Sequence, residues 1–287
     1  MANKALLEIP DRNNDHIKTL HVLLCCSGSV ATLKIPELIT KIVALGRIKI
    51  RVVCSSKAAY HFLERSKTYN LHYYNEFIKL GGYDLIIDEY DEWAWNQIGD
   101  PVLHIELRKW ADIIVVAPAS ADLIAKAASG ISDSLLLSVL RAWDFKNHNK
   151  PCILCPAMNS LMWDHPSTRE SIDKLEKWGW IVVGPATKKL ACNDTGKGAL
   201  EEVNNIIQVV HGGLEARLEL LKQFNDKEDV SIIDKIYEAK QKKWFRVRGP
   251  NYSGDKDTTY WVFATATALL VLTASVILGI KILNRAK

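Results

Sequence analysis

Residues 21–31 read HVLLCCSGSVA, an apolar run that ends in small polar residues. The stretch that follows, 31–45, repeats its apolar positions every three or four residues, which predicts a strand, a tight turn and a helix. In such a turn Gly28 lets a ligand approach the backbone, and the helix that begins near Ser29 and Val30 offers N–H groups to an anion. The spacing is not that of a G-x-G-x-x-G dinucleotide motif, so a turn without a ligand is an equal alternative.

Segments of strand character alternate with helical segments along most of the chain. They are 48–54, 85–88, 112–117, 151–155 and 181–183. The apolar run at 112–117 predicts a strand buried on both faces. The alternation predicts an α/β, Rossmann-like parallel sheet with helices on both faces and a ligand at the carboxyl ends of the strands. Ser55 and Ser56 follow the second strand, and their hydroxyls together with those of the first turn suit one phosphate, as in a mononucleotide.

Three further segments carry side chains suited to chemistry. His104 and Arg108 lie one turn apart on a helix predicted to start near Asp100-Pro101, Asn159 follows the strand 151–155, and Cys192 lies in the polar stretch 188–199. Each also has a structural interpretation: a histidine that only packs, a helix cap, and a thiol in an exposed turn. Cys152 and Cys155 lie three apart on a strand and point to opposite faces, so we expect no zinc site.

Composition limits the class of protein. The chain has 287 residues, 48% of them hydrophobic and 24% charged, which is the balance of a folded domain. Its net charge of +4 arises from 37 basic and 33 acidic side chains, too even a mixture to indicate nucleic acid as the main partner. Six cysteines are too few for a disulfide scaffold, and no secretory signal precedes residue 20, so we expect free thiols in a reducing compartment.

The C-terminal part differs from the rest. Residues 260–280 contain no charge and as a helix would reach about 32 Å, enough to cross a bilayer. Tyr260 and Trp261 occupy the place of an aromatic belt, and the tail 281–287 is basic. More basic residues precede the span than follow it, which favours a tail anchor with the folded domain in the cytosol and leaves the identity of the membrane open. A buried core helix is the alternative.

These observations divide the chain into five parts. They are a polar N-terminal segment 1–19, a ligand-binding domain 20–211, a charged linker 212–259 that Gly212-Gly213 separates from the domain, the transmembrane helix 260–280, and the tail 281–287. Within the linker, five basic residues crowd positions 240–248 beside Trp244 and Phe245. This cluster either lies on an anionic membrane surface or forms a solvated helix.

Taken together, six segments resemble the flavin-dependent cysteine decarboxylases. They are SGSVA at 27–31, DPVLHIELRKWAD at 100–112, VAPASADLIAKAASGISDSLL at 116–136, RAWD at 141–144, PCILCPAMN at 151–159 and KKLACNDTGKGAL at 188–200. The resemblance implies FMN as cofactor and decarboxylation of 4′-phosphopantothenoylcysteine to 4′-phosphopantetheine, a step of coenzyme A biosynthesis. It also implies a homotrimer with sites at the subunit interfaces. A membrane anchor lies outside the usual plan of this family.

The resemblance assigns roles to individual residues. It implies His104 and Cys192 as catalytic, the latter as a proton donor on a lid, and Asn159 as the residue that binds the substrate carboxylate. We group Arg108 with Asn159 as substrate-binding because it shares a helix face with His104. The residues implied at FMN are Gly28, Ser29, Val30, Ser55, Ser56, Ser120, Ala121, Asp122, Leu123 and Ala157.

The sequence also departs from the family pattern. The usual Ala-Asn-Thr reads Ala121-Asp122-Leu123, the usual Asp-Asn reads Asp133-Ser134, and Asn193 stands where glycine is usual. An aspartate near the flavin would place an anion where the family has a neutral amide. Some relatives regulate protein phosphatases, so a membrane-tethered flavin-binding regulatory subunit is the alternative function, and decarboxylation of a peptide C-terminal cysteine is a third.

Overall fold

A computed structural model describes residues 19–55, 57–87, 89–95, 97–98, 100–145, 150–189 and 195–225. The strands of the main sheet are β1 (Leu20–Cys26), β2 (Ile48–Cys54), β3 (Ile86–Ile87), β4 (Ile113–Ala119), β5 (Cys152–Pro156) and β6 (Ile181–Val182). Their order in the sheet is β3-β2-β1-β4-β5-β6, and every pair is parallel. This is the doubly wound order, and it confirms the predicted Rossmann-like α/β fold.

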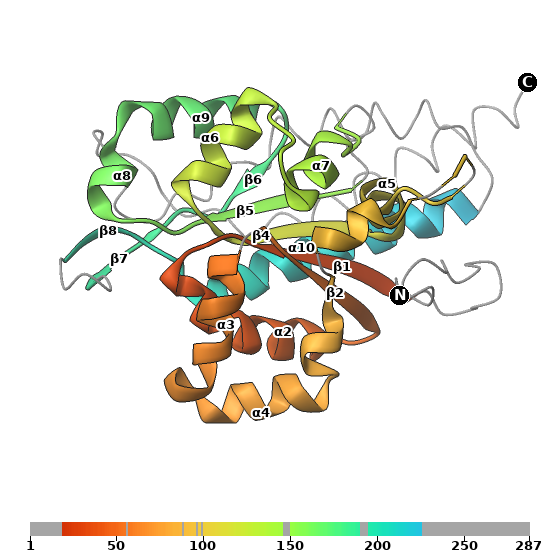
Figure 1. Ribbon diagram of the computed structural model, residues 1–287, viewed down its shortest axis with the longest axis horizontal. Helices are drawn as coiled ribbons and strands as arrows, with labels where there is room; N and C mark the ends of the chain where they lie inside the picture. Colours follow the sequence, from red (N-terminus) through yellow and green to blue (C-terminus); the bar gives the residue numbers. More distant parts are fainter. Residues whose placement is uncertain are drawn as a thin grey trace, which may run out of the picture. The chain divides into compact units, whose positions relative to one another are not determined.

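Helices cover both faces of the sheet (Figure 1). They are the short helix η2 (Val30–Lys34), α2 (Ile35–Val43), α3 (Lys57–Tyr69), α4 (Leu71–Lys79), η3 (Gly82–Leu85), η4 (Glu89–Ala94), α5 (Leu103–Trp110), α6 (Ala121–Ser129), α7 (Leu135–Arg141), α8 (Ser160–Asp164), α9 (Pro166–Lys177) and α10 (Val203–Asn225). Helices α2 and α10 pack on one face of β1 and β4, and α6, α7 and α9 lie on the other. An antiparallel pair, β7 (Ala186–Lys189) and β8 (Thr195–Ala199), stands beside the sheet.

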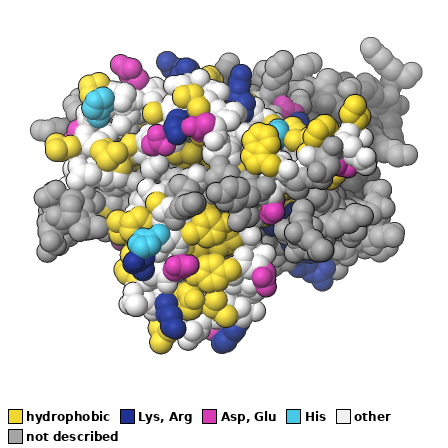
Figure 2. All heavy atoms as spheres, viewed as in Figure 1, with side chains coloured by type: hydrophobic (Ala, Val, Ile, Leu, Met, Phe, Trp, Pro, Cys, Tyr) yellow, Lys and Arg dark blue, Asp and Glu magenta, His cyan; other side chains and the backbone are white. Residues whose placement is uncertain are grey.

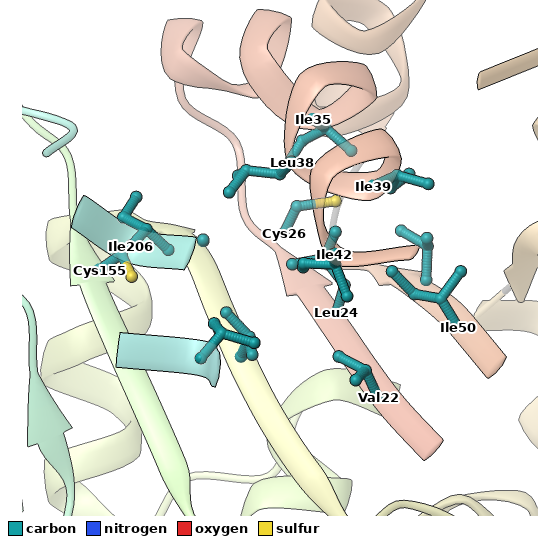
Figure 3. Packing of buried hydrophobic residues seen from close by; sticks show 14 of the residues in the cluster. Val22, Leu24, Cys26, Ile35, Leu38, Ile39, Ile42, Ile50, Cys155 and Ile206 are labelled. Carbon is teal, nitrogen blue, oxygen red and sulfur yellow. The ribbon is translucent and has the colours of Figure 1, made fainter. Parts of the chain in front are cut away.

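The core explains why these segments take these forms. All seven residues of β1 and of β4 are buried, as expected for central strands covered on both faces. Helix α2 buries Ile35, Leu38, Ile39 and Ile42, a spacing of three and four that forms one face against β1 (Figure 3). Each of these side chains contributes about 1.5–3 kcal/mol by leaving water.

The boundaries of several elements differ from the sequence-based expectation. The first helix begins as the 3₁₀ turn η2 and becomes an α-helix only at Ile35, because Pro36 suits the first turn of a helix. Helix α5 begins at Leu103 and not near Pro101, and the third strand is only two residues long. The described ends of the polar stretch 188–199 pair as the antiparallel hairpin β7–β8.

The prediction that Gly212-Gly213 starts a linker is wrong, because α10 continues through both glycines to Asn225. The cause is close packing on the sheet. A Cβ atom at Gly213 would lie 2.9 Å from Ile113 Cδ1 and 3.6 Å from Pro151, whereas one at Gly212 would meet nothing within 4 Å. Gly213 therefore serves helix–sheet contact and does not end the helix.

The remaining tail predictions concern residues outside the described ranges: the linker beyond Asn225, the span 260–280 and the tail 281–287. Among the helices that are described, none combines the length and the apolar character needed to cross a membrane.

Candidate flavin and substrate site

The carboxyl ends of β1 and β4 form the centre of the predicted site, at the point where the strand order reverses. Ser27 joins the two loops that leave these strands. Its N–H and its Oγ both donate to the carbonyl of Pro118, at 3.1 and 2.8 Å, and Ser27 Oγ accepts from the N–H of Ser120 at 2.7 Å. Ser27 is 2% exposed, so these bonds lie away from water and fix one loop against the other.

The first loop has the predicted form. Gly28 is exposed, Ser29 caps η2 by accepting from the N–H of Ala31 at 3.4 Å, and the side chain of Val30 is 40% exposed. The neighbouring strand ends beside it, since the N–H of Ser55 donates to the carbonyl of Cys26 at 2.9 Å. The structure thus brings Gly28–Val30 and Ser55 together. Ser56 lies outside the described residues.

Helix α6 starts at the same edge. Ser120 caps it by accepting from the N–H of Leu123 at 3.3 Å, so Ala121, Asp122 and Leu123 form its first turn. The side chain of Asp122 is 71% exposed and lies 3.3 Å from Lys126, which also contacts Asp133 at 2.9 Å. The charge of Asp122 is therefore paired with Lys126 on the surface of α6.

The donor set at this edge fits a phosphate with a polyhydroxyl chain. It consists of serine hydroxyls and backbone N–H groups at two helix starts, and the positive end of the α6 dipole adds attraction for an anion. The one carboxylate in the first turn of α6 is paired with a lysine. These features match the ribityl phosphate of FMN by the chemistry of the groups present.

Asn159 also lies at the carboxyl edge, after β5. The N–H of Ala157 donates to the carbonyl of Ala119 at 2.9 Å, which ties this loop to the end of β4, and Ala157 is buried. Asn159 Oδ1 accepts from the N–H of Leu161 at 2.9 Å, so its side chain caps α8. The cap interpretation is confirmed. It is compatible with a binding role, because the cap uses the amide oxygen, whereas a carboxylate needs the NH₂ group.

His104 has a partner that sequence reasoning missed. Glu92, on η4, accepts from the backbone N–H of His104 at 3.1 Å with one carboxylate oxygen, and its other oxygen contacts His104 Nδ1. The side chain of His104 is 26% exposed and that of Glu92 is 16% exposed. The only signal in the sequence was an acidic residue twelve positions earlier in the chain. Arg108 is half-buried on the same helix, and its carbonyl accepts from Lys150 Nζ at 3.0 Å.

The end of α5, the helix of His104, is tied to the amino edge of the sheet. The carbonyl of Trp110, at the end of α5, accepts from His21 Nδ1 at 3.0 Å, and His21 is at the amino end of β1. His104 lies six residues from Trp110, about 9 Å of helix, whereas His21 and Ser27 are separated by about 20 Å of strand. The end of α5 is thus anchored at the edge of the sheet opposite the serine loops, the loops of Ser27 and Ser120 that follow β1 and β4. Cys192 lies outside the described residues.

Comparison with known proteins assigns the class. The model of the Flavoprotein family matches residues 10–215, and the chain belongs to that family. Within it, the chain belongs with the phosphopantothenoylcysteine decarboxylases. It is 38% identical to the enzyme of that name from Mus musculus over 198 residues, which cover 69% of this chain and 88% of the relative. With the Arabidopsis thaliana enzyme it shares 38% identity over 205 residues, 70% of this chain and 90% of the relative.

Solved structures agree. A PPC decarboxylase mutant complexed with pantothenoylaminoethenethiol has 38% sequence identity and a TM-score of 0.59, and the match covers 69% of this chain and 100% of that one. The FMN binding protein AtHal3 has 39% identity and a TM-score of 0.55, with 67% and 95% covered. The family match over residues 10–215 includes the serine loops, His104 and Asn159.

Proposed function

We propose that the chain catalyses the FMN-dependent decarboxylation of 4′-phosphopantothenoylcysteine to 4′-phosphopantetheine in coenzyme A biosynthesis. Membership of the decarboxylase family supports this function. The structural observation that carries it is the Ser27–Ser120 hydrogen bond, which assembles hydroxyl and N–H donors for FMN at the same sheet edge as Asn159.

Each side chain has a distinct task in this scheme. FMN held at the Ser27 and Ser120 loops would supply reversible two-electron chemistry: the substrate thiol would be oxidised to a thioaldehyde that stabilises the electrons left by the departing carbon dioxide, and the same two electrons would return to the product. The NH₂ group of Asn159 holds the substrate carboxylate. Glu92 accepts the Nδ1 proton of His104, which leaves the Nε2 lone pair to take a proton from the substrate. Cys192 returns a proton to the product.

The first test is turnover by the full-length chain purified in detergent. We expect a flavin absorbance spectrum and release of carbon dioxide from 4′-phosphopantothenoylcysteine. An Asn159→Ala variant should keep the flavin spectrum and lose turnover. Flavin without turnover in the wild-type chain would contradict the enzyme assignment and support the regulatory-subunit alternative, and turnover of a peptide C-terminal cysteine alone would support the third function.

We also propose that a second copy of the chain supplies His104, within a homotrimer. The anchoring of the end of α5 at the amino edge of the sheet, opposite the serine loops, supports sharing between copies. So does the apolar surface beside it, where Trp93 is 83%, Trp95 47%, Ile98 96% and Val102 37% exposed. Aromatic and aliphatic side chains this exposed are typical of an interface.

Complementation tests the shared site. His104→Asn and Asn159→Ala should each be inactive alone. In co-expressed mixed trimers, a site that draws these two residues from different copies is intact in about one case in four. We therefore expect about a quarter of wild-type turnover per flavin. No recovery would show that both residues serve within one chain.

The third proposal is the membrane tether. Residues 260–280 have the length and composition of a span, and the excess of basic residues before it favours a cytosolic domain. Removing 260–287 should move the protein from the membrane pellet to the supernatant after cell lysis. If the shortened chain still sediments, a Lys240→Glu, Lys243→Glu, Arg246→Glu variant then tests the basic cluster as the attachment.

A further inference from the structure

We propose that Gly196 and Gly198 of β8 are positioning residues for Asn159: by lacking side chains they let β8 lie directly on the two residues that flank it. The inference deepens the proposed function and rests on it. Strand β8 and the loop between β5 and α8 are joined by a backbone hydrogen bond, in which the N–H of Met158 donates to the carbonyl of Gly198 at 2.8 Å.

The steric evidence is specific to each glycine. A Cβ atom at Gly198 would lie 2.4 Å from the carbonyl oxygen of Met158, and the φ of Gly198 is +131°, which side chains rarely permit. A Cβ atom at Gly196 would lie 2.2 Å from Ser160 Oγ and 3.0 Å from Ser160 Cβ. The two glycines therefore contact the residues immediately before and after Asn159.

The contact matters because of how Asn159 is held. Its amide oxygen is committed to the N–H of Leu161, so the direction of the NH₂ group follows the loop and the start of α8. The loop is tied on one side to β4 through Ala157 and on the other to β8 through Met158. Moving β8 outward releases the second tie and turns the amide away from the substrate carboxylate.

The hydroxyl of Ser160 gives independent evidence that β8 packs closely on the start of α8. Its hydroxyl is buried and has no hydrogen-bond partner among the described residues. Leaving a buried hydroxyl unsatisfied costs stability, and the position is nevertheless covered by β8 at Gly196. The packing of β8 on α8 is therefore maintained although it leaves the Ser160 hydroxyl without a hydrogen bond.

The test compares glycines at which an added Cβ atom causes a steric clash with glycines at which it causes backbone strain. Gly196→Ala introduces only the clash, since no positive φ is present there. Gly46→Ala introduces only the backbone strain, at a φ of +139° with nothing within 4 Å, and Gly184→Ala introduces neither. In the full-length chain loaded with FMN, Gly196→Ala should raise the KM for 4′-phosphopantothenoylcysteine at least about tenfold and change kcat less, because ground-state carboxylate binding is lost.

Rescue distinguishes positioning from general damage. The clash of Gly196→Ala is with Ser160, so adding Ser160→Gly should restore the KM to within about threefold of the wild type. A second readout needs no turnover: hydrogen exchange of the Met158 amide should speed up in Gly196→Ala and slow again in the double variant. Both control variants should match the wild type in KM and in exchange at Met158.

Three results would overturn the inference: an unchanged KM for Gly196→Ala, an equal rise for Gly184→Ala, or no recovery on adding Ser160→Gly. Absence of turnover in the wild-type chain would instead contradict the proposed function. In that event the exchange rate of Met158 still decides whether β8 positions the loop.

Discussion

The contact between His104 and Glu92 predicts that replacing His104 lowers kcat more than replacing Glu92 does. In the proposed mechanism the carboxylate would fix which ring nitrogen carries the proton, and the ring would perform the transfer. His104→Asn should therefore lower kcat by about 10²–10⁴-fold, the range of general base catalysis, and Glu92→Gln by a smaller factor of about tenfold. Steady-state kinetics with flavin content measured in parallel checks both values.

A matched control for this pair is His211→Asn. His211 is half-exposed on α10 and has a carboxylate, that of Glu215, 3.7 Å away and one turn along the helix, but it belongs to no predicted site. We expect wild-type kinetics from it. A loss for Glu92→Gln as large as that for His104→Asn would mean that the carboxylate itself takes part in proton transfer.

At the scale of elements, the two adjacent glycines of α10 should respond in opposite ways. Gly212→Ala removes backbone freedom in open space and should raise the free energy of unfolding by about 0.5–1 kcal/mol. Gly213→Leu must force its side chain against Ile113 and Pro151, so it should lower the free energy of unfolding by about 1–3 kcal/mol. Urea unfolding measures both, and similar effects at the two positions would refute the packing role of Gly213.

Sequence patterns were sufficient to predict some elements and not others. The strands 48–54 and 21–26 were predictable because apolar runs bounded by polar turns belong to central parallel strands, and the serine loops follow from strand direction. The packing role of Gly213 could not be predicted, because a glycine that ends a helix and one that permits close packing look identical in sequence. Glu92 and the β8 contact with Met158 were missed because both depend on tertiary approach between segments.

At the scale of the whole molecule, the buried thiols predict a pH dependence of stability. Burial raises the pKa of Cys25 and Cys152, and the contact with Cys54 at 3.1 Å together with burial raises that of Cys26. In the unfolded chain these thiols ionise near pH 8.5, so the unfolded state loses protons first. Stability is therefore intact below about pH 8.5 and falls as the pH rises above it.

Thermal unfolding under reducing conditions at pH 7.5, 8.5 and 9.5 measures this fall. Each buried thiol contributes about 1.4 kcal/mol per pH unit above its unfolded pKa. Replacing one of them, Cys25→Ala, should lower the starting stability but make the decline with pH shallower by one such increment. A decline of unchanged steepness would show that other groups cause it.

The course of α10 determines at which edge of the sheet the chain leaves the folded domain. The helix passes Ile113 and Pro151 at the amino ends of β4 and β5, and Arg217 reaches Asp112 at 3.4 Å, so its last residues lead away from the amino edge of the sheet (Figure 1). Figure 2 shows that one face of the described residues exposes hydrophobic side chains among charged ones. The described part of α10 therefore ends at the edge of the sheet opposite the loops of Ser27 and Ser120, so the chain leaves the folded domain on the side away from the proposed entrance for small molecules.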